Sequence, residues 1–290
     1  MDGIIVIDKP QDFTSFDVVA KMRGILRTRK IGHAGTLDPM ATGVLPLLIG
    51  RATKACDILP DQRKRYTASF RLGLTTNTQD ITGEVLTTSP VNVSHRQAEA
   101  AIMAMQGDIL QIPPMYSAIK IKGKRLYDLA RSGIEVEREA RPITIEDIRL
   151  ISCDGNDYSI DVLCSKGTYI RTLCHDIGQA LGCGATMTAL RRTMAAGIPL
   201  EAALTIEQVQ KLADSGEIAG HVLSTEALFS CLEAVRLDSK RALLFRNGVP
   251  ITLAACAGRF SVYSPNGFIG VAATGDDGAV ASRTLFALEV

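Results

Sequence analysis

The sequence lacks the features that mark membrane, secreted and fibrous proteins. No apolar run approaches the roughly 18 residues that a membrane span needs, and the apolar stretch 3–7 lies between Asp2 and Asp8 with no basic segment before it. Internal repeats and low-complexity stretches are absent, and 46% apolar with 22% charged residues are ordinary values for a globular protein. These absences exclude disordered, collagenous and coiled-coil chains, and they predict a mature cytoplasmic protein.

Patterns for metals and disulfides are equally scarce. The 7 cysteines are odd in number and widely spaced, and none belongs to a CxxC pair, so neither a disulfide framework nor a zinc ribbon is indicated. Cys174 and His175 with Cys183 come nearest to a metal cluster, but reduced cysteine usually behaves as a small buried apolar residue. The chain also has no dinucleotide-binding fingerprint. We therefore expect no cofactor and no metal.

Positive charge is concentrated in three runs although the formal net charge is only +1. The first run lies in residues 21–30, where no acid occurs, the second is residues 63–65, and the third lies in 120–125. Their cations are Lys21, Arg23, Arg27, Arg29, Lys30, Arg63, Lys64, Arg65, Lys120, Lys122, Lys124 and Arg125. The runs form one phosphate-binding face if the fold brings them together, and three unrelated solvated faces if it does not.

Helices and strands are interspersed irregularly along the chain. Thr14 and Asp17 form a capping box that opens a helix, with apolar positions at Phe16, Val18, Val19, Met22, Ile25 and Leu26. We expect strands over 4–7, 44–49, 66–72, 143–151 and 158–164, a loop over 31–43, and helices over 95–105, 171–181 and 206–213. Because regular βαβ alternation is missing, the pattern predicts an α+β fold with a mixed or antiparallel sheet. After about residue 231, β-prone runs between turn signals indicate a small β-rich C-terminal module.

The glycine-rich segment 32–43 is the part of the chain that packing explains least. Its three glycines allow close approach of the backbone, and the strand expected after it provides a rigid support. The segment displays one carboxylate, Asp38. With no second acid nearby, such a carboxylate can serve as a nucleophile or a general base. The alternative is that Asp38 begins an Asx or Asp-Pro turn.

Three further residues have both a functional and a structural interpretation. Arg171 stands at an expected helix start, where the helix dipole disfavours a cation unless Asp38 or a phosphate is nearby, or else it is a surface arginine. Tyr66 follows the second run of cations and suits stacking on a base, or else it is a core residue. His33, set between glycines, either enters a nucleic-acid stack or is an inert loop residue.

Several segments, taken in order, resemble the TruB-type tRNA pseudouridine synthases, a family that isomerises a uridine in the T-loop. The resemblance extends over roughly residues 3–200. It is carried by residues 3–10, 32–46, 65–66, 72–73, 78–80, 113–118, 123–127, 167–173 and 190–193.

The resemblance implies a role for each candidate residue. Asp38 corresponds to the catalytic aspartate of the family, Tyr66 to the tyrosine that stacks on the target uracil, and Arg171 to the arginine that pairs with the aspartate. The other implied site residues are the pocket residues Tyr169 and Leu190, the loop supports Lys9 and Pro10, and His33, which contacts the flipped nucleotide. Asp12 departs from the family, which usually has a glycine there.

The resemblance also implies an architecture and a substrate. It implies a pseudouridine synthase catalytic domain over 1–230, in which 114–142 form an insertion that grips tRNA, and a PUA-like RNA-binding module over 231–290. The implied substrate is uridine 55 in the T-arm at the tRNA elbow, and the implied enzyme is a monomer that needs no cofactor, membrane or protein partner. Two alternatives remain open: a protein that binds or folds tRNA and whose aspartate is incidental, and a guide-RNA-dependent synthase.

Overall fold

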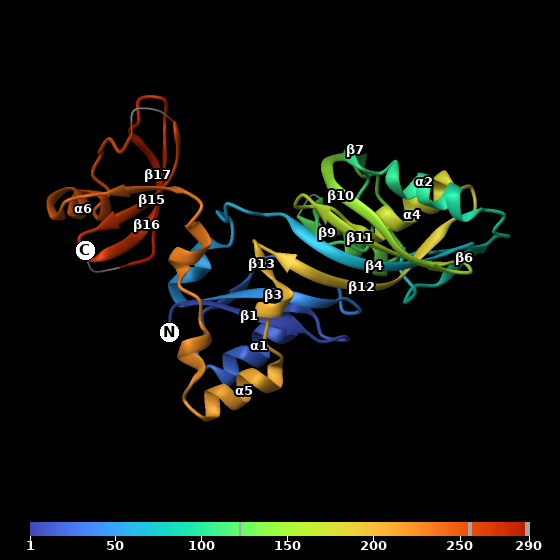
Figure 1. The fold of residues 1–290 in the computed structure, drawn as a ribbon, viewed down its shortest axis with the longest axis horizontal. Coiled ribbons are helices and arrows are strands. Elements are labelled where there is room, and N and C mark those ends of the chain that lie inside the picture. Colours follow the sequence, from blue (N-terminus) through green and yellow to red (C-terminus); the bar gives the residue numbers. More distant parts are fainter. Residues whose placement is uncertain (122, 255–256, 288–290) are drawn as a thin grey trace. The chain divides into compact units, whose positions relative to one another are not determined.

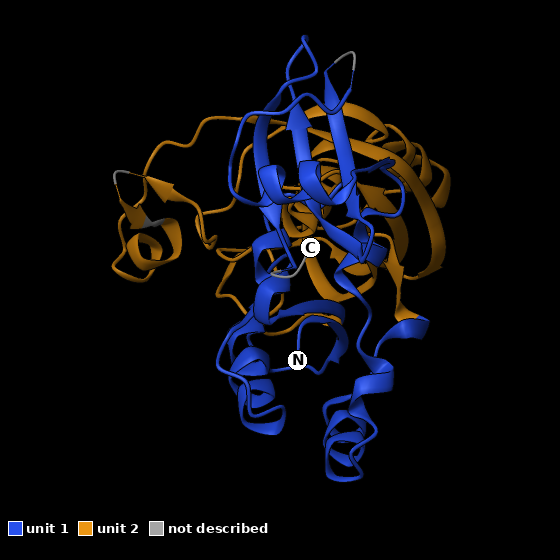
Figure 2. Ribbon diagram, turned by 90° about the vertical axis from the view of Figure 1, so that its left-hand side faces the viewer, with its two compact units in different colours: residues 1–38, 44–61, 201–290 blue, residues 39–43, 62–200 orange. Residues whose placement is uncertain are grey.

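The chain divides into two compact units. The computed structural model describes residues 1–121, 123–254 and 257–287. Unit 1 comprises Met1–Asp38, Val44–Asp61 and Glu201–Val290, and unit 2 comprises Pro39–Gly43 and Gln62–Leu200 (Figure 2). The division therefore falls within the glycine-rich loop, directly after Asp38. No described helix is both long and apolar enough to cross a membrane.

Unit 1 opens with β1 (Gly3–Lys9), α1 (Ser15–Ile25), β2 (Ile31–His33) and β3 (Thr42–Ile49), of which β3 lies beside β1 (Figure 1). Strand β2 pairs antiparallel with β3, from Ile31 opposite Ile49 to His33 opposite Leu47. The prediction of a loop over all of 31–43 was wrong at its start. The physical reason is that Ile31 is buried in the core of unit 1, which pulls residues 31–33 into the sheet.

Helix α1 confirms the capping box and corrects one core assignment. The Thr14 side chain accepts a hydrogen bond from the Asp17 N–H, and the Asp17 side chain accepts one from the Thr14 N–H. Val18 is buried, whereas Phe16, two residues earlier, is 63% exposed and stacks on the Arg23 guanidinium. Residues two apart on a helix point to nearly opposite sides, so both cannot face the core.

The parts of unit 1 between β3 and the C-terminal sheet contain helix α5 and several short 3₁₀ segments. Helix α5 (Ile206–Asp214) begins with the capping box of Thr205 and Gln208 and packs against the core that α1 and β3 form. Short 3₁₀ segments are η1 (Gly50–Ala55), η3 (Ile218–His221) and η4 (Thr225–Phe229), and η2 (Leu200–Ala202) begins at the end of unit 2. Backbone bonds from Ile4 to Leu223 and from Asp8 to Leu204 attach this segment to β1.

Unit 2 is built on an antiparallel sheet in the order β12-β4-β11-β10-β7. Its strands are β4 (Lys64–Leu72), β7 (Gly107–Gln111), β10 (Arg141–Asp154), β11 (Asp157–Cys164) and β12 (Ala185–Ala195), with β13 (Ile198–Pro199) on β12. The first residues of β3, Thr42 and Gly43, pair in parallel with Arg191 and Arg192 of β12. This parallel pair makes the sheet mixed, and the predicted α+β class is confirmed.

Helices cover one face of the unit 2 sheet. Helices α2 (His95–Met103) and α4 (Ile170–Ala180) contact each other and the sheet (Figure 1). The alternating burial of β4 and β11 is that of strands with one covered face. The smaller elements are the hairpin β5 (Leu74–Thr76) with β6 (Val85–Thr88), the hairpin β8 (Lys120–Ile121) with β9 (Lys124–Arg125), and α3 (Leu126–Arg131).

The second and third runs of cations both lie in unit 2. Arg63 pairs with Glu146, and Arg65 pairs with Asp147 and Asp161. These acids pair with both arginines of the second run, while the Lys64 ammonium donates to the Gln62 carbonyl. The third run remains a candidate, because Lys120 and Lys124 are exposed on the β8–β9 hairpin, while Lys122 lies outside the described residues.

The C-terminal part of unit 1 forms a separate sheet in the order β14-β15-β16-β17. Its strands are β14 (Glu233–Arg236), β15 (Gly258–Ser264), β16 (Gly267–Thr274) and β17 (Val280–Leu285). The turns predicted at Pro265-Asn266 and around Asp276 are present. Asn247-Gly248, however, ends a helix that was not predicted, α6 (Ser239–Arg246), because Asp238 caps its start and Gly248 takes the left-handed conformation at its end.

Candidate active site

Three of the predicted site residues, Lys9, His33 and Asp38, belong to unit 1. His33 ends β2, and the Ala34 N–H donates to the Pro46 carbonyl, so the start of the loop remains attached to β3. Asp38 is half-buried. The residue before it, Leu37, is buried and fixes the backbone from which the Asp38 side chain extends.

A serine on α1 holds the loop next to Asp38. The buried Ser15 hydroxyl accepts a hydrogen bond from the Leu37 N–H at 2.8 Å and donates to the Leu37 carbonyl at 3.3 Å. Both backbone polar groups of Leu37 are thereby satisfied inside the protein, where leaving them unbonded would be costly. Sequence reasoning missed Ser15 as a site residue, because a contact across 22 positions has no local signal.

Lys9 supports this arrangement at the same end of α1. Its side chain is fully buried, and its ammonium donates to the carbonyls of Pro10 and Phe13, which closes the turn that leads into α1. The same turn contains Asp12 in the left-handed conformation, with φ of 66°, which explains why a glycine suits this position. Lys9 thus fixes the turn, the turn fixes α1, and Ser15 of α1 fixes the loop.

The other four predicted residues, Tyr66, Tyr169, Arg171 and Leu190, belong to unit 2. Tyr66 in β4 is opposite Val162 in β11 and Arg192 in β12. Leu190 is opposite Ala68, and because side chains alternate along strands, it lies on the same face as Tyr66 in a diagonal position. Tyr66 and Leu190 are both buried.

The last residues of the loop are fixed on β12 close to Leu190. The Arg191 guanidinium donates to the Thr42 hydroxyl at 3.2 Å. Gly43 has a φ of 101°, and a Cβ built there would lie 2.2 Å from the Arg192 carbonyl oxygen. Only glycine therefore fits this junction, which fixes the end of the loop on β12 within unit 2.

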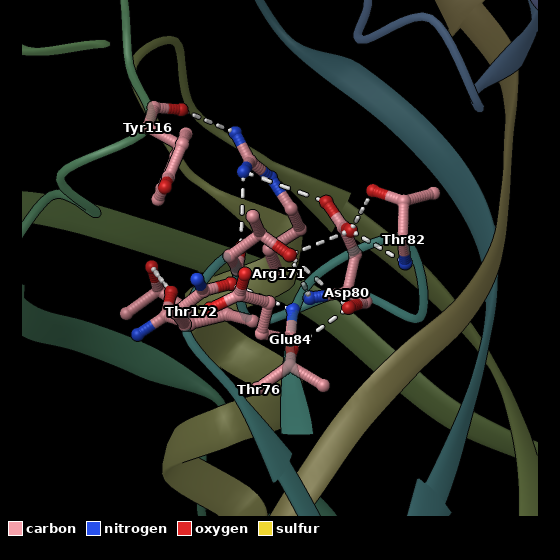
Figure 3. A network of polar contacts seen from close by, with 10 residues as sticks. Thr76, Asp80, Thr82, Glu84, Tyr116, Arg171 and Thr172 are labelled. Carbon is pink, nitrogen blue, oxygen red and sulfur yellow. Dashed lines mark hydrogen bonds and ion pairs between the residues drawn. The ribbon is translucent and has the colours of Figure 1, made fainter. Parts of the chain in front are cut away.

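Arg171 is the centre of a buried polar network in unit 2 (Figure 3). It lies in the first turn of α4, and its guanidinium donates to the carbonyls of Thr78 at 3.1 Å and Tyr116 at 2.8 Å. One nitrogen lies 3.5 Å from the Asp80 carboxylate, and both side chains are only 5% exposed. The surface alternative for Arg171 is thus wrong, and Asp80 is an anion of the kind that a cation at this helix end needs.

The Asp80 carboxylate is itself fixed by hydroxyl and amide donors. Its Oδ1 accepts from the Thr78 hydroxyl at 2.8 Å, from the Thr82 hydroxyl at 2.6 Å and from the Thr82 N–H at 3.0 Å. These bonds orient the carboxylate toward Arg171. The sequence did contain a signal, because residues 78–80 carry part of the family resemblance, but no role followed from it.

Tyr169 is positioned through its backbone. It is the residue before α4, and Gln111 at the end of β7 both donates to its carbonyl at 3.1 Å and accepts from its N–H at 2.8 Å. Gln111 is buried and was not predicted as part of the site. A second contact, from the Thr172 hydroxyl to the Gln79 side chain, joins α4 to the segment that contains Asp80.

The described residues offer little for a metal. No three His, Cys, Asp or Glu side chains among them are grouped so that they could hold an ion. Burial raises the pKa of the Cys174 thiol, which is typical of an inert structural cysteine.

Comparison with known proteins places the chain in a family. The model described as "TruB family pseudouridylate synthase (N terminal domain)" matches residues 23–170, and the "tRNA pseudouridylate synthase B C-terminal domain" matches residues 171–230. The chain belongs to the TruB family of pseudouridylate synthases. It is accordingly an isomerase that makes pseudouridine in tRNA, and the resemblance noted from the sequence is confirmed.

Individual relatives agree with this assignment. The tRNA pseudouridine synthase B of Chromobacterium violaceum is 44% identical over 283 residues, covering 96% of this chain and 92% of the relative. That of Alkaliphilus oremlandii is 51% identical over 218 residues, covering 75% of this chain and 73% of the relative.

Solved structures share the fold. A Cbf5–Nop10–Gar1 complex matches with a TM-score of 0.73 and 25% identity, over 95% of this chain and 79% of that one. An archaeal box H/ACA sRNP Nop10–Cbf5 complex matches with a TM-score of 0.74 and 24% identity, over 98% and 86%. The predicted pseudouridine synthase fold is thus confirmed.

Proposed function

We propose that this enzyme isomerises uridine 55 in the T-loop of tRNA, and that the Asp38 carboxylate is the group that reacts with the nucleotide. The observation that carries the proposal is the backbone directly before Asp38, where the Ser15 hydroxyl binds both polar groups of Leu37 within unit 1. Backbone that is fixed in this way presents the next side chain, that of Asp38, in a defined position. The relatives at 44% and 51% identity are named tRNA pseudouridine synthase B, which supports the substrate.

The reaction needs one reacting carboxylate. The N1–C1′ bond of the uridine breaks, uracil rejoins the ribose through C5, and the C5 proton leaves while N1 gains one, so the change involves no redox step. Covalent help from an aspartate divides such a difficult step into easier ones. The target base lies within folded RNA and has to be flipped into a pocket before it can react. Tyr66 provides the aromatic ring on which the flipped uracil stacks, and Leu190 on the same sheet face lines the pocket.

Arg171 has the electrostatic role in this proposal. Asp80 and the two carbonyls fix its guanidinium, and a fixed guanidinium binds a carboxylate with defined geometry. We assign it to pair with Asp38 and to keep that carboxylate ionised. Tyr169, held by Gln111, lines the same pocket, while His33 contacts the flipped nucleotide and Lys9 supports the loop.

The rest of the chain provides tRNA binding in this proposal. Residues 114–142 grip the T-arm with the exposed Lys120 and Lys124, and the β-rich residues 231–290 act as a PUA-like module. The enzyme works as a monomer in the cytoplasm, where its substrate is. Guide-dependent action is the second candidate, since the solved structures that share the fold include box H/ACA complexes. Their identity of 24–25%, against 44–51% for the tRNA synthases, favours the enzyme that acts alone.

Asp38→Asn tests the proposal. The substitution keeps the shape of the side chain and removes its charge and nearly all its nucleophilicity. With pure protein and an unmodified tRNA transcript, wild type should form pseudouridine at one uridine of the T-loop, and the variant should lose turnover by about three orders of magnitude or more. The modified position is mapped uridine by uridine, and tRNA binding by the variant should persist.

Asp57→Asn is the matched control, because Asp57 is an exposed acid of the same unit outside the loop, and its activity should equal that of wild type. Near wild-type turnover by Asp38→Asn, after mass spectrometry has excluded deamidation, would falsify the assignment of Asp38. Activity that appears only when a guide RNA or another protein is added supports the second candidate instead. If the protein binds tRNA but forms no pseudouridine, the result supports the alternative of a protein that binds or folds tRNA.

A further inference from the structure

Helix α1 ends at a residue that helix ends disfavour. The Thr28 N–H donates to the Arg23 carbonyl and the Arg27 N–H to the Gly24 carbonyl, which together form a Schellman motif. In this motif the residue after the C-cap, here Arg27, takes the left-handed conformation, and its φ is 49°. Glycine is the usual residue there, because any side chain with a Cβ is strained. An arginine at this position suggests that its side chain is needed.

The residues that follow make this helix end strongly positive. Arg27, Arg29 and Lys30, which we call the basic turn, are exposed, and the ion pairs of the described residues include none of the three. In the first run of cations, the Arg23 guanidinium differs from these three because it donates a hydrogen bond to the Ile31 carbonyl. Both arginines of the second run, at 63–65, pair with acids, so the basic turn differs from them in carrying positive charge to solvent without an acidic partner among the described residues. Such a cluster attracts a polyanion.

The protein around the basic turn leaves it accessible. Arg27 borders a hollow of about 620 Å³ between α1 and α5, whose lining includes Lys21 and Asp214. The Asp214 carboxylate accepts a hydrogen bond from Gln210 on its own helix at 2.8 Å. Solvent therefore reaches Arg27 from the side of the helix as well as from outside.

The basic turn leads directly into the catalytic loop. Lys30 precedes β2, and its carbonyl accepts from the Gly50 N–H at 2.8 Å, which fixes the turn to the end of β3. Lys30 lies eight positions before Asp38 in the chain, and a segment of that length spans at most about 28 Å. An RNA arm whose target nucleotide lies at Asp38 carries backbone phosphates over such a distance. RNA therefore fits the basic turn better than an acidic protein surface does.

We propose that the basic turn binds backbone phosphates of the tRNA substrate, outside the catalytic loop, and that Arg27 occupies the strained helix end because its guanidinium makes one of these contacts. The proposal rests on the proposed function, since it takes tRNA to be the substrate. It makes no claim on which base is modified, because phosphate contacts position a nucleic acid without reading its sequence.

Arg27→Gly separates folding from binding. Glycine adopts the left-handed conformation without strain, so the melting temperature should be unchanged or higher. The dissociation constant for an unmodified tRNA transcript should rise about three- to tenfold at low salt, and the slope of log K against log [KCl] should become shallower by about 0.9. The double variant Arg29→Gln with Lys30→Gln should reduce the slope by about twice as much.

Two controls show whether the effect belongs to this site. Arg27→Lys keeps the charge and should bind nearly as wild type does. Lys211→Gln removes an exposed cation of the same unit that lies on α5 between the acids Glu207 and Asp214, and should leave the affinity and slope unchanged.

The outcomes are distinguishable. If wild type binds tRNA with a steep salt dependence and both variants of the basic turn bind identically, the inference is overturned while the proposed function stands, and an acidic protein becomes the partner to seek. If Lys211→Gln weakens binding as much as Arg27→Gly, the effect reflects net charge, and the site is likewise rejected. If wild type neither binds tRNA nor forms pseudouridine, the proposed function fails first.

Discussion

At the scale of single residues, the buried ion pair of Arg171 and Asp80 explains how a cation is accommodated at the start of α4. A helix N-terminus repels positive charge, and burial removes the water that would otherwise solvate the guanidinium. Asp80 provides the opposite charge, and the hydroxyls of Thr78 and Thr82 fix it. The pair is therefore a rigid electrostatic element rather than a flexible surface contact.

Asp80→Asn should break this element. The amide keeps the shape but removes the negative charge, so a buried guanidinium loses its carboxylate at a cost of about 3–5 kcal/mol in unfolding free energy. If Arg171 has the role proposed above, pseudouridine formation should fall by at least about a hundredfold, because a misplaced guanidinium would not orient the Asp38 carboxylate. Denaturant unfolding and single-turnover assays measure the two effects.

Asp157→Asn provides the comparison, because it breaks an Arg–Asp pair in the same unit that is about half exposed. Its unfolding free energy should change by less than about 1 kcal/mol, and its activity should stay at the wild-type level. Equal stability losses in the two variants would mean that the pair at Asp80 has no special importance.

At the scale of elements, α1 holds the start of the loop 32–43, which contains Asp38. Its start is fixed by the capping box and by the turn that Lys9 closes. Its first residue, Ser15, then binds both backbone groups of Leu37. The Ser15 hydroxyl thus helps to fix the register between α1 and the loop.

Ser15→Ala should loosen the loop without unfolding the protein. It leaves the buried Leu37 N–H without its hydrogen bond, which costs about 1–3 kcal/mol. Because Asp38 follows directly, kcat should fall more than tenfold while KM changes little, since tRNA binding residues are untouched. Steady-state kinetics on unmodified tRNA separates the two constants.

Ser94→Ala is matched to it, as another serine whose hydroxyl binds a backbone N–H, here as the N-cap of α2. It should cost a similar amount of stability, about 1 kcal/mol, and leave kcat unchanged. A fall in kcat in both variants would point to a general loss of stability as the cause.

At the scale of the whole molecule, one half-buried acid makes folding depend on pH. Desolvation raises the pKa of Asp176 on α4 from 3.8 to about 6. The folded state therefore holds this proton more tightly than the unfolded state, so the stabilising contribution of the protonated carboxyl is complete below about pH 3.8 and is lost as the pH rises through about 6.

Asp176→Asn should remove this dependence. The neutral amide resembles the protonated acid, so at pH 8 the variant should be more stable than wild type, by at most about 1–2 kcal/mol because the carboxyl is only half-buried. Near pH 4 the two proteins should unfold alike. Thermal unfolding at several pH values checks this, with Glu99→Gln on the exposed face of α2 as the control. An equal gain in stability at pH 4 and at pH 8 would rule out desolvation of Asp176 as the cause.

Features that depend on near neighbours in the chain were determined by the sequence alone. The capping box predicted at Thr14 follows from two residues three positions apart and is present, and the boxes at Ser94 and Thr205 have the same local spacing. Strands such as 66–72 were predicted because alternation of apolar residues is a local pattern, and the family followed from motifs that lie in order along the chain.

Contacts between distant residues were decided only by the tertiary structure. Asp80 reaches Arg171, and Ser15 reaches Leu37, because strands and helices bring together segments that no local pattern relates. The same holds for Phe16, whose exposure depends on which side of α1 meets the core, and for the two arginines of the second run, which pair with acids of two other strands. Burial and pairing depend on the whole packing arrangement, whereas propensity and capping depend only on the adjacent turn of the chain.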